Sequence, residues 1–346
     1  MDLHKAEGQE IVRRLAAICD VVVENFRPGR LEEWRLSYPQ LSAVNPGLVM
    51  VRISGFGQTG PYSQRAGYGV IGEAVSGLRH VTGDPDRPPA RAAVSLTDYI
   101  TGLYGAFGAV MALLKRERTG CGQLIDAALY ECAFSFMEPH IPAFDKLGFV
   151  ANRAGSRLPD STPNNLYETR DGRFVHITAM GDAVFRRLVS TMGQPGLADD
   201  PRFRDGIARS AHHEEIDEVI LAWTRQHDLG EIESRLEKAQ VPATRIYTMA
   251  DIFGDAHYRA RDMLVGVPDG DLGSITMAGV VPKLSATPGM VRHSGHEVGQ
   301  DTRRVLGAWL ELSDAELDRL AQGGVIYCGG PSPREVETLD ERAGAA

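Results

Sequence analysis

The sequence predicts an α/β fold whose first part is built around a largely parallel sheet. Two short segments, 20–24 and 48–54, are rich in apolar and β-branched residues, as buried strands are. The segments that precede them, 7–17 and 29–45, are predicted to be helices, and in the first of these the apolar and charged residues lie on opposite faces. Helices that alternate with buried strands are typical of a parallel sheet covered by helices. Residues 1–3 are expected to form the end of a further strand.

The sequence that follows changes from turn-rich to helical. Residues 55–97 are rich in Gly, Pro and short polar turns, and a long helix is predicted over 98–116. Within this helix Gly102, Gly105 and Gly108 recur every three residues. Each glycine costs a helix up to about 1 kcal/mol, so the repeat predicts that another backbone packs closely there. Two further elements are expected, a strand over 123–129 and a helical segment over 130–147.

A second domain is predicted after residues 152–165, where Pro and Arg residues indicate a linker that crosses between domains. The elements expected beyond it are a strand over 173–178, helices over 182–192, 214–226 and 229–239, a helix around Arg259, a hairpin-like segment over 264–278, and helices over 300–310 and 314–323. The tail beyond Tyr327 has the composition of a disordered segment.

Composition and charge narrow the class of protein. The chain of 346 residues is 43% hydrophobic and 24% charged, as globular proteins are, and its formal net charge is −9. Proteins that bind nucleic acids or membrane surfaces usually present a basic face, so we expect neither kind of partner. The sequence has no apolar run of about 18 residues. Its first residues lack a basic region followed by an apolar run, so we expect no signal peptide.

Cysteine and histidine spacing indicates neither disulfides nor a metal site. The four cysteines are scattered along the chain, at positions 19, 121, 132 and 328, without a C-x-x-C motif. Reduced thiols are the better interpretation, and we expect a cytoplasmic protein. The pairs His212-His213 and His293/His296 lack acidic partners at metal-ligand spacing, so no metal is expected.

A glycine motif follows the second predicted strand. Residues 55–60 match the G-x-G-x-x-G pattern of dinucleotide-binding proteins, in which a helix opens at the third glycine. Here residues 61–67 follow instead, with a proline, a further glycine and no apolar periodicity. We therefore expect a loop whose glycines allow close approach to a ligand or to a neighbouring backbone.

Asp98 begins the long predicted helix, and two interpretations fit this position. As an N-cap, its side chain would accept hydrogen bonds from free backbone N–H groups. As a nucleophile, it would use the same geometry differently: a helix N-terminus keeps a carboxylate ionised, and an ionised carboxylate in a glycine-lined pocket can attack an acyl group. The residue pattern by itself leaves both interpretations open.

Several stretches, taken together and in this order, resemble the class III CoA-transferases, the family of formyl-CoA transferase and the carnitine and bile-acid CoA-transferases. They run almost from end to end of the chain: 20–29 (DVVVENFRPG), 54–62 (SGFGQTGPY), 67–68 (GY), 83–85 (GDP), 98–103 (DYITGL), 118–123 (RTGCGQ) and 282–289 (PKLSATPG).

The resemblance implies a large Rossmann-like α/β domain built from both chain ends, a smaller α+β domain between them, and an interlocked homodimer. We accordingly expect the first part of the large domain over 1–150, the small domain with its linkers over 151–255, a return to the large domain over 256–327, and a disordered tail over 328–346. Members of the family also carry several tens of residues before the point that matches Met1, so the chain is expected to lack that segment.

The resemblance also assigns roles to individual residues. The aspartate that opens the D-x-x-T-G helix is the nucleophile of the family, and this position is Asp98; Tyr68 matches a tyrosine that lines the reaction centre. The residues expected at coenzyme A are Asn25, Phe26, Arg27, His4 (where relatives often have a lysine near the phosphates) and, at the entrance of the site, Gly57 and Gln58. A departure is Gly69, which replaces an acidic residue common after the tyrosine.

The implied activity is the transfer of coenzyme A from an acyl-CoA to a small free carboxylic acid through an aspartyl-CoA thioester. Coenzyme A is then a substrate, and no tightly bound cofactor is expected. One alternative is an α-methylacyl-CoA racemase, which needs a histidine where this chain has Tyr68, a poor base because its usual pKa is about 10. The other alternative is a truncated, non-catalytic CoA-binding remnant.

Overall fold

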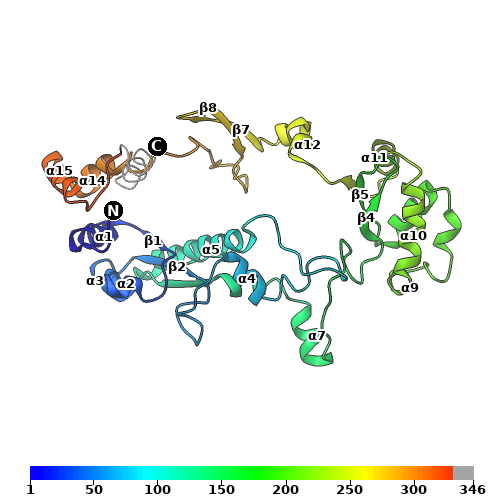
Figure 1. Cartoon of the computed structure of the whole chain (residues 1–346), viewed down its shortest axis with the longest axis horizontal. Coiled ribbons are helices and arrows are strands. Elements are labelled where there is room, and N and C mark those ends of the chain that lie inside the picture. Colours follow the sequence, from blue (N-terminus) through cyan, green and yellow to red (C-terminus); the bar gives the residue numbers. More distant parts are fainter. Residues whose placement is uncertain (330–346) are drawn as a thin grey trace, which may run out of the picture. The chain divides into compact units, whose positions relative to one another are not determined.

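A computed structural model describes residues 1–329, and the chain divides into two compact units (Figure 1). Of the described residues, unit 1 contains Met1–Leu78, Ala92–Phe149 and residues 262–329, and unit 2 contains Arg79–Arg91 and Val150–Arg261. The tail expected over 328–346 lies outside the described residues from position 330 on.

Unit 1 is organised around a parallel sheet of three strands in the order β1-β2-β3. The strands are β1 (Val21–Glu24), β2 (Val49–Ser54) and β3 (Leu124–Ala128). Five of the six residues of the central strand β2 are buried, so both faces of this strand are covered. The predicted mixed α/β fold with a parallel sheet is confirmed.

Unit 1 contains nine α-helices among its described residues. They are α1 (Ala6–Ile18), α2 (Arg30–Glu33), α3 (Tyr38–Val44), α4 (Gly69–Val75), α5 (Leu96–Thr119), α6 (Leu129–Phe134), α7 (His140–Leu147), α14 (Thr302–Leu310) and α15 (Asp314–Gln322). A hairpin of β7 (Leu264–Asp269) and β8 (Gly273–Ala278) also belongs to unit 1, as expected for 264–278. The helix predicted over 29–45 is in fact two helices, because Arg35 adopts a φ of 57° and Ser37 starts a new capping box with Gln40.

The long helix α5 lies against the sheet, and two of its three glycines touch it. A Cβ on Gly105 would lie 3.2 Å from Cγ1 of Val51, and one on Gly108 would lie 3.2 Å from Cγ2 of Ile125. A Cβ on Gly102 would have open space around it. The expectation that these glycines admit another backbone is therefore wrong: at two positions they make room for side chains of the sheet.

The two ends of the described chain pack together within unit 1. One buried cluster joins α1 to the last two helices and consists of Ile11, Leu306, Leu310, Leu317, Leu320, Val325 and Ile326. The backbone N–H of Asp2 donates to the carbonyl oxygen of Val325 at 2.8 Å. Residues 1–3 therefore form a turn against the C-terminal segment, and the strand end predicted there is wrong.

Unit 2 is built on an antiparallel sheet of three strands in the order β4-β5-β6. The strands are β4 (Asn164–Glu168), β5 (Phe174–Thr178) and β6 (Ala243–Arg245). The helices are α8 (Asp182–Thr191), the 3-10 helix η1 (Pro195–Ala198), α9 (Gly206–Ala211), α10 (His213–Thr224), α11 (Leu229–Lys238), α12 (Met249–Gly254) and α13 (Ala256–Ala260). Apolar side chains from the sheet, α8, α10 and α11 form its core, among them Tyr167, Ile177, Phe185, Leu188, Ile216, Ile220, Ile232 and Leu236.

Two segments differ from the expected organisation. Residues 79–91 pack with unit 2 and not with the first part of the large domain, because Gly83 forms an isolated bridge with Gly155 and Nε of Arg153 donates to the carbonyl oxygen of Asp84 at 3.0 Å. The turn-rich stretch 55–97 contains the helix α4, for which the sequence has no apolar periodicity.

A membrane-spanning helix would need a long apolar stretch, and none of the helices within residues 1–329 has one.

Candidate active site

The expected site loops of unit 1 lie at one edge of its sheet. The segment Asn25–Arg27 follows β1 and the segment Gly57–Gln58 comes shortly after β2, and the two strands are parallel neighbours. Their carboxyl ends therefore lie side by side, which is where open α/β sheets bind ligands. Helix α5 runs from this edge toward the amino ends of the strands, since near its C-terminus NH1 of Arg116 lies 3.3 Å from the carbonyl oxygen of Gly47, just before β2, and 2.8 Å from Oδ1 of Asp20, just before β1. Its N-terminal end, which carries Asp98, consequently lies at the same edge.

Asp98 is the third residue of α5 and not its N-cap, which is Ser95. Its side chain is exposed and lies against the start of α4: a Cβ on Gly69 would lie 1.9 Å from Oδ2 of Asp98. The Oγ1 of Thr97 donates to the carbonyl oxygen of Gly69 at 2.7 Å, so the first turns of the two helices are joined directly. A side chain at position 69 would displace this carboxylate, which gives the departure at Gly69 a structural reason.

Tyr68 is the chain neighbour of Gly69, the residue next to this carboxylate. It is the N-cap residue of α4, has an extended backbone conformation and is 78% exposed. Tyr68 and Asp98, which are 30 residues apart in the sequence, thus belong to the adjoining N-terminal ends of α4 and α5.

The glycine loop after β2 is tied to the sheet through its backbone. The N–H of Gly57 donates to Oγ of Ser54 at 3.0 Å, and the N–H of Gln58 donates to Oδ2 of Asp126 at 2.8 Å. A Cβ on Gly55 would lie 2.9 Å from the Cα of Gly67, so the close approach predicted for these glycines is that of a neighbouring backbone. The Nε2 of Gln58 is a buried donor without a hydrogen-bond partner within residues 1–329.

The segment expected to bind coenzyme A is exposed, and its backbone is hydrogen-bonded to a buried side chain. Asn25, Phe26 and Arg27 are all exposed, while the N–H of Phe26 donates to Oε2 of the buried Glu24 at 2.7 Å. The ring of Phe26 meets the ring of Trp34 edge to face, with centroids 5.1 Å apart.

His4 lies beside the same tryptophan. Its ring centroid is 5.5 Å from that of Trp34, also edge to face, and its Nδ1 lies 3.1 Å from Oδ1 of Asp2. The structure therefore gathers His4 with Phe26 at one surface through Trp34, a residue that the sequence analysis did not single out.

Beneath this segment a buried arginine bridges two carboxylates. Nε of Arg52 donates to Oε1 of Glu24 at 2.5 Å, and its NH1 and NH2 donate to the two carboxylate oxygens of Glu32 at 2.7 and 3.3 Å. Burial disfavours the charged guanidinium, yet the bonds to Glu32 and Glu24 outweigh it and raise the pKa of Arg52 above its usual value. The hydrogen bonds from Arg52 likewise lower the pKa of Glu32.

Residues 1–302 match the model of the protein family described as CoA-transferase family III. The chain belongs to this family. It is 46% identical over 326 residues to the succinyl-CoA–D-citramalate CoA-transferase of Chloroflexus aurantiacus, a similarity that covers 94% of this chain and 81% of that protein. It is also 32% identical to the succinyl-CoA:glutarate CoA-transferase of Mus musculus, over 94% of this chain and 74% of that one.

The fold of this family III CoA-transferase matches solved structures as well. A crystal structure of a CAIB/BAIF family protein from Brucella suis superimposes with a TM-score of 0.77 at 32% identity, covering 89% of this chain and 80% of that one. The chain is therefore an enzyme of acyl-CoA metabolism that transfers coenzyme A, and the resemblance stated from the sequence motifs is confirmed.

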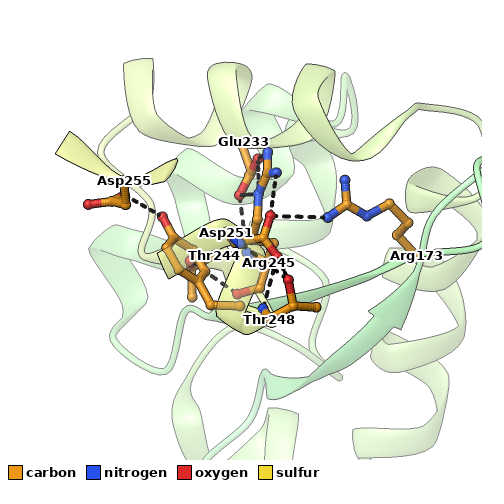
Figure 2. A network of polar contacts seen from close by, with 8 residues as sticks. Arg173, Glu233, Thr244, Arg245, Thr248, Asp251 and Asp255 are labelled. Carbon is orange, nitrogen blue, oxygen red and sulfur yellow. Dashed lines mark hydrogen bonds and ion pairs between the residues drawn. The ribbon is translucent and has the colours of Figure 1, made fainter. Parts of the chain in front are cut away.

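Unit 2 of this CoA-transferase carries a second arginine network, drawn in Figure 2. Arg245 donates from its backbone N and its Nε to Oε1 of Glu233, at 3.1 and 3.0 Å, and its NH2 bonds to Oε2 of the same side chain. NH1 of Arg245 lies 3.6 Å from Oδ1 of Asp251, toward which Arg173 also points (Figure 2). The bonds from Arg245 lower the pKa of Glu233. Glu233, Arg245 and Asp251 line a polar cavity of 280 Å³ together with Tyr247.

Proposed function

We propose that this enzyme moves coenzyme A from succinyl-CoA to a small dicarboxylic acid, with Asp98 as the covalent relay. The observation that carries the proposal is the exposed carboxylate of Asp98, held in the first turn of α5 against a glycine that leaves space beside it. Relatives named for D-citramalate, L-malate and glutarate transfer from succinyl-CoA support the choice of substrates.

The reaction proceeds through two carboxylates in turn and needs no net transfer of a proton. The Asp98 carboxylate attacks the thioester carbonyl carbon, the C–S bond breaks, and a mixed anhydride and the coenzyme A thiolate form. The thiolate attacks the aspartyl carbonyl carbon, releases the donor acid and leaves an aspartyl-CoA thioester. The acceptor carboxylate then attacks this thioester, and the released thiolate attacks the acceptor acyl carbon and restores Asp98. Dividing one transfer into such steps is nucleophilic catalysis.

The surroundings of Asp98 support particular roles for its neighbours. Tyr68, which is exposed at the N-terminal end of α4, would line the reacting carbonyl. The backbone N–H groups of Gly57 and Gln58 are already paired, so oxyanion stabilisation by this loop would come from another donor, for which the unpartnered Nε2 of Gln58 is suited. Asn25, Phe26, Arg27 and His4 would contact coenzyme A.

The decisive experiment replaces the nucleophile. Asp98→Asn keeps the size of the side chain and removes its charge, and we expect transfer from succinyl-CoA to fall by about 10⁴-fold or more. Mass spectrometry of the wild-type enzyme with succinyl-CoA should detect an aspartyl adduct trapped by hydroxylamine on the peptide that contains Asp98. The matched control is Glu117→Gln, an exposed carboxylate at the other end of α5, which should keep full activity. Wild-type turnover by Asp98→Asn would refute the proposal.

We also propose that the enzyme works as an interlocked homodimer. One face of α5 is apolar and exposed over its whole length, at Tyr99, Leu103, Phe107, Val110 and Leu114. Helix α7 buries none of its residues, although Ile141, Phe144 and Leu147 are apolar. Patches of this extent mark protein interfaces, and a second copy is the occupant that the family resemblance implies.

Light scattering should give twice the 37.6 kDa mass of the chain. Phe107→Glu should lower the measured mass or prevent assembly, because it places a charge in the proposed interface. A wild-type protein that stays at the mass of one chain would contradict the dimer.

A cytoplasmic location remains a prediction. The four cysteines, all unpaired, are consistent with it.

A further inference from the structure

Arg52 has an unusual position for a charged residue of a sheet. It lies in the central strand β2 with its side chain 5% exposed, and the side chain of its partner Glu24 is 4% exposed. Burying two charges costs several kcal/mol per ion unless their geometry is good and their remaining hydrogen bonds are made. Apolar residues of similar volume would stabilise the sheet as well or better, so a need for stability alone does not explain this pair.

The two carboxylates that Arg52 holds lie on either side of the segment Asn25–Arg27. Glu24 ends β1 and directly precedes the segment, and Glu32 belongs to α2, which follows it. Arg52 therefore binds the chain on both sides of the loop. It makes one hydrogen bond to Glu24 and a bidentate contact with Glu32. Such bidentate, charge-assisted contacts fix orientation as well as distance.

The buried pair also reaches the backbone of the loop itself. Glu24 uses one carboxylate oxygen for Arg52 and the other for the N–H of Phe26, at 2.7 Å. A rotation of this carboxylate would break one of the two bonds, so the direction of the Phe26 amide is set by Arg52 through Glu24. No apolar substitute for the pair would reproduce this contact.

The same strand end fixes the second loop of the site. Ser54 lies two residues beyond Arg52, on the same face of β2, and its Oγ accepts the N–H of Gly57. Each of the two loops at this sheet edge is thus positioned by a polar side chain of β2.

We propose that Arg52 is a positioning residue for coenzyme A, which acts through Glu24 and Glu32 to hold Asn25–Arg27 in the conformation that receives this part of the substrate. This inference rests on the proposed function, because it takes that segment as the binding site. Arg52 itself does not touch the substrate. The arrangement is prepared before binding, so the ordering of the loop does not reduce the affinity for coenzyme A.

The test compares two adjacent carboxylates of α2. Glu32→Gln removes the negative charge that forms an ion pair with Arg52. Glu33→Gln is the control, because Glu33 pairs with Arg30 on the surface. Titration calorimetry with free coenzyme A should give a Kd about fivefold or more weaker for Glu32→Gln and an unchanged Kd for Glu33→Gln. Arg52→Lys, which keeps the charge and loses the fork, should weaken binding in the same direction.

Two further measurements separate positioning from general loss of structure. Hydrogen exchange of the peptide containing Phe26 should speed up in Arg52→Lys while peptides of β3 keep their protection. The KM for succinyl-CoA should rise in Glu32→Gln while the KM for the acceptor acid is retained, a split that general destabilisation does not produce.

Asn25→Ala distinguishes a failure of this inference from a failure of the proposed function. If Asn25→Ala weakens coenzyme A binding but Glu32→Gln and Arg52→Lys do not, Arg52 is not a positioning residue and the proposed site stands. If Asn25→Ala also leaves the Kd unchanged, the placement of coenzyme A is wrong and the inference is overturned with it.

Discussion

Two arginines of this enzyme have nearly the same partners and very different surroundings. Arg52 in unit 1 and Arg245 in unit 2 are each held by a glutamate and lie near a second carboxylate. The side chains of Arg52 and Glu24 are 5% and 4% exposed, whereas those of Arg245 and Glu233 are 28% and 24% exposed. Water therefore reaches the second pair and is excluded from the first.

The difference teaches what each network can do. A pair that water reaches gains little from its charges, and either partner can be hydrated if the other is lost. In a pair shielded from water neither charge can be hydrated, so the two side chains keep their paired arrangement. The loop that is hydrogen-bonded to such a pair is then held in one conformation. The network of unit 2, drawn in Figure 2, instead lines an open polar cavity.

The largest expected effect comes from removing each guanidinium. Arg52→Met leaves the buried carboxylate of Glu24 unpaired and should destabilise unit 1 by about 3–5 kcal/mol. Arg245→Met leaves carboxylates that water can hydrate and should cost unit 2 about 1 kcal/mol or less. Hydrogen exchange at increasing denaturant, with peptides of the two units followed separately, measures both losses because the units need not unfold together.

The comparison is sharpened by removing both buried charges at once. Glu24→Gln combined with Arg52→Met leaves no unpaired buried charge, and it should recover about 2 kcal/mol of the loss. Equal losses for Arg52→Met and Arg245→Met, or a double variant no more stable than the single one, would contradict the role given to burial.

A smaller effect is expected from pH. The pKa values of Glu32 and Glu233 are both lowered, chiefly by hydrogen bonds from their arginines. Their stabilising contribution is therefore complete above the unfolded pKa of about 4.3 and is lost as pH falls through the folded pKa. The difference in Tm between wild type and Glu233→Gln should be largest near neutral pH and should vanish in acid. Glu32→Gln should follow the same course with a smaller amplitude, because Glu32 is more exposed. Differences that do not change with pH would rule out ionised partners.

The sequence predicted the elements whose residues carry a local signal. The strands β1 and β2 and the start of α5 near Asp98 were predicted correctly. Burial of a strand and the periodicity of a helix can both be recognised from the residue types in a short stretch of sequence. Helix α4 was missed because Gly69 and Gly72 face neighbours too close for a side chain, and glycines conceal a helical pattern. The family resemblance, and not periodicity, placed Tyr68 and Asp98 at one site.

The contacts beneath the coenzyme A loop had no such signal. Glu24 and Arg52 lie 28 residues apart, and they face each other only because the parallel register of β1 and β2 pairs these two positions. The register depends on the whole sheet. Trp34 was missed for a related reason, since its partners His4 and Phe26 come from segments on either side of β1.

The packing of the first helix against the last two sets an order for events during synthesis. Ile11 leaves the ribosome about 300 residues before Leu317, and at roughly 5–20 residues per second its neighbours emerge some fifteen seconds to a minute later. Throughout that interval Ile11 lacks the side chains that bury it in the folded protein. Unit 2 is complete once Arg261 has been made. In a nascent chain unit 2 should therefore fold before α1 packs against α14 and α15. Chaperones that shield α1 would matter most between these two events.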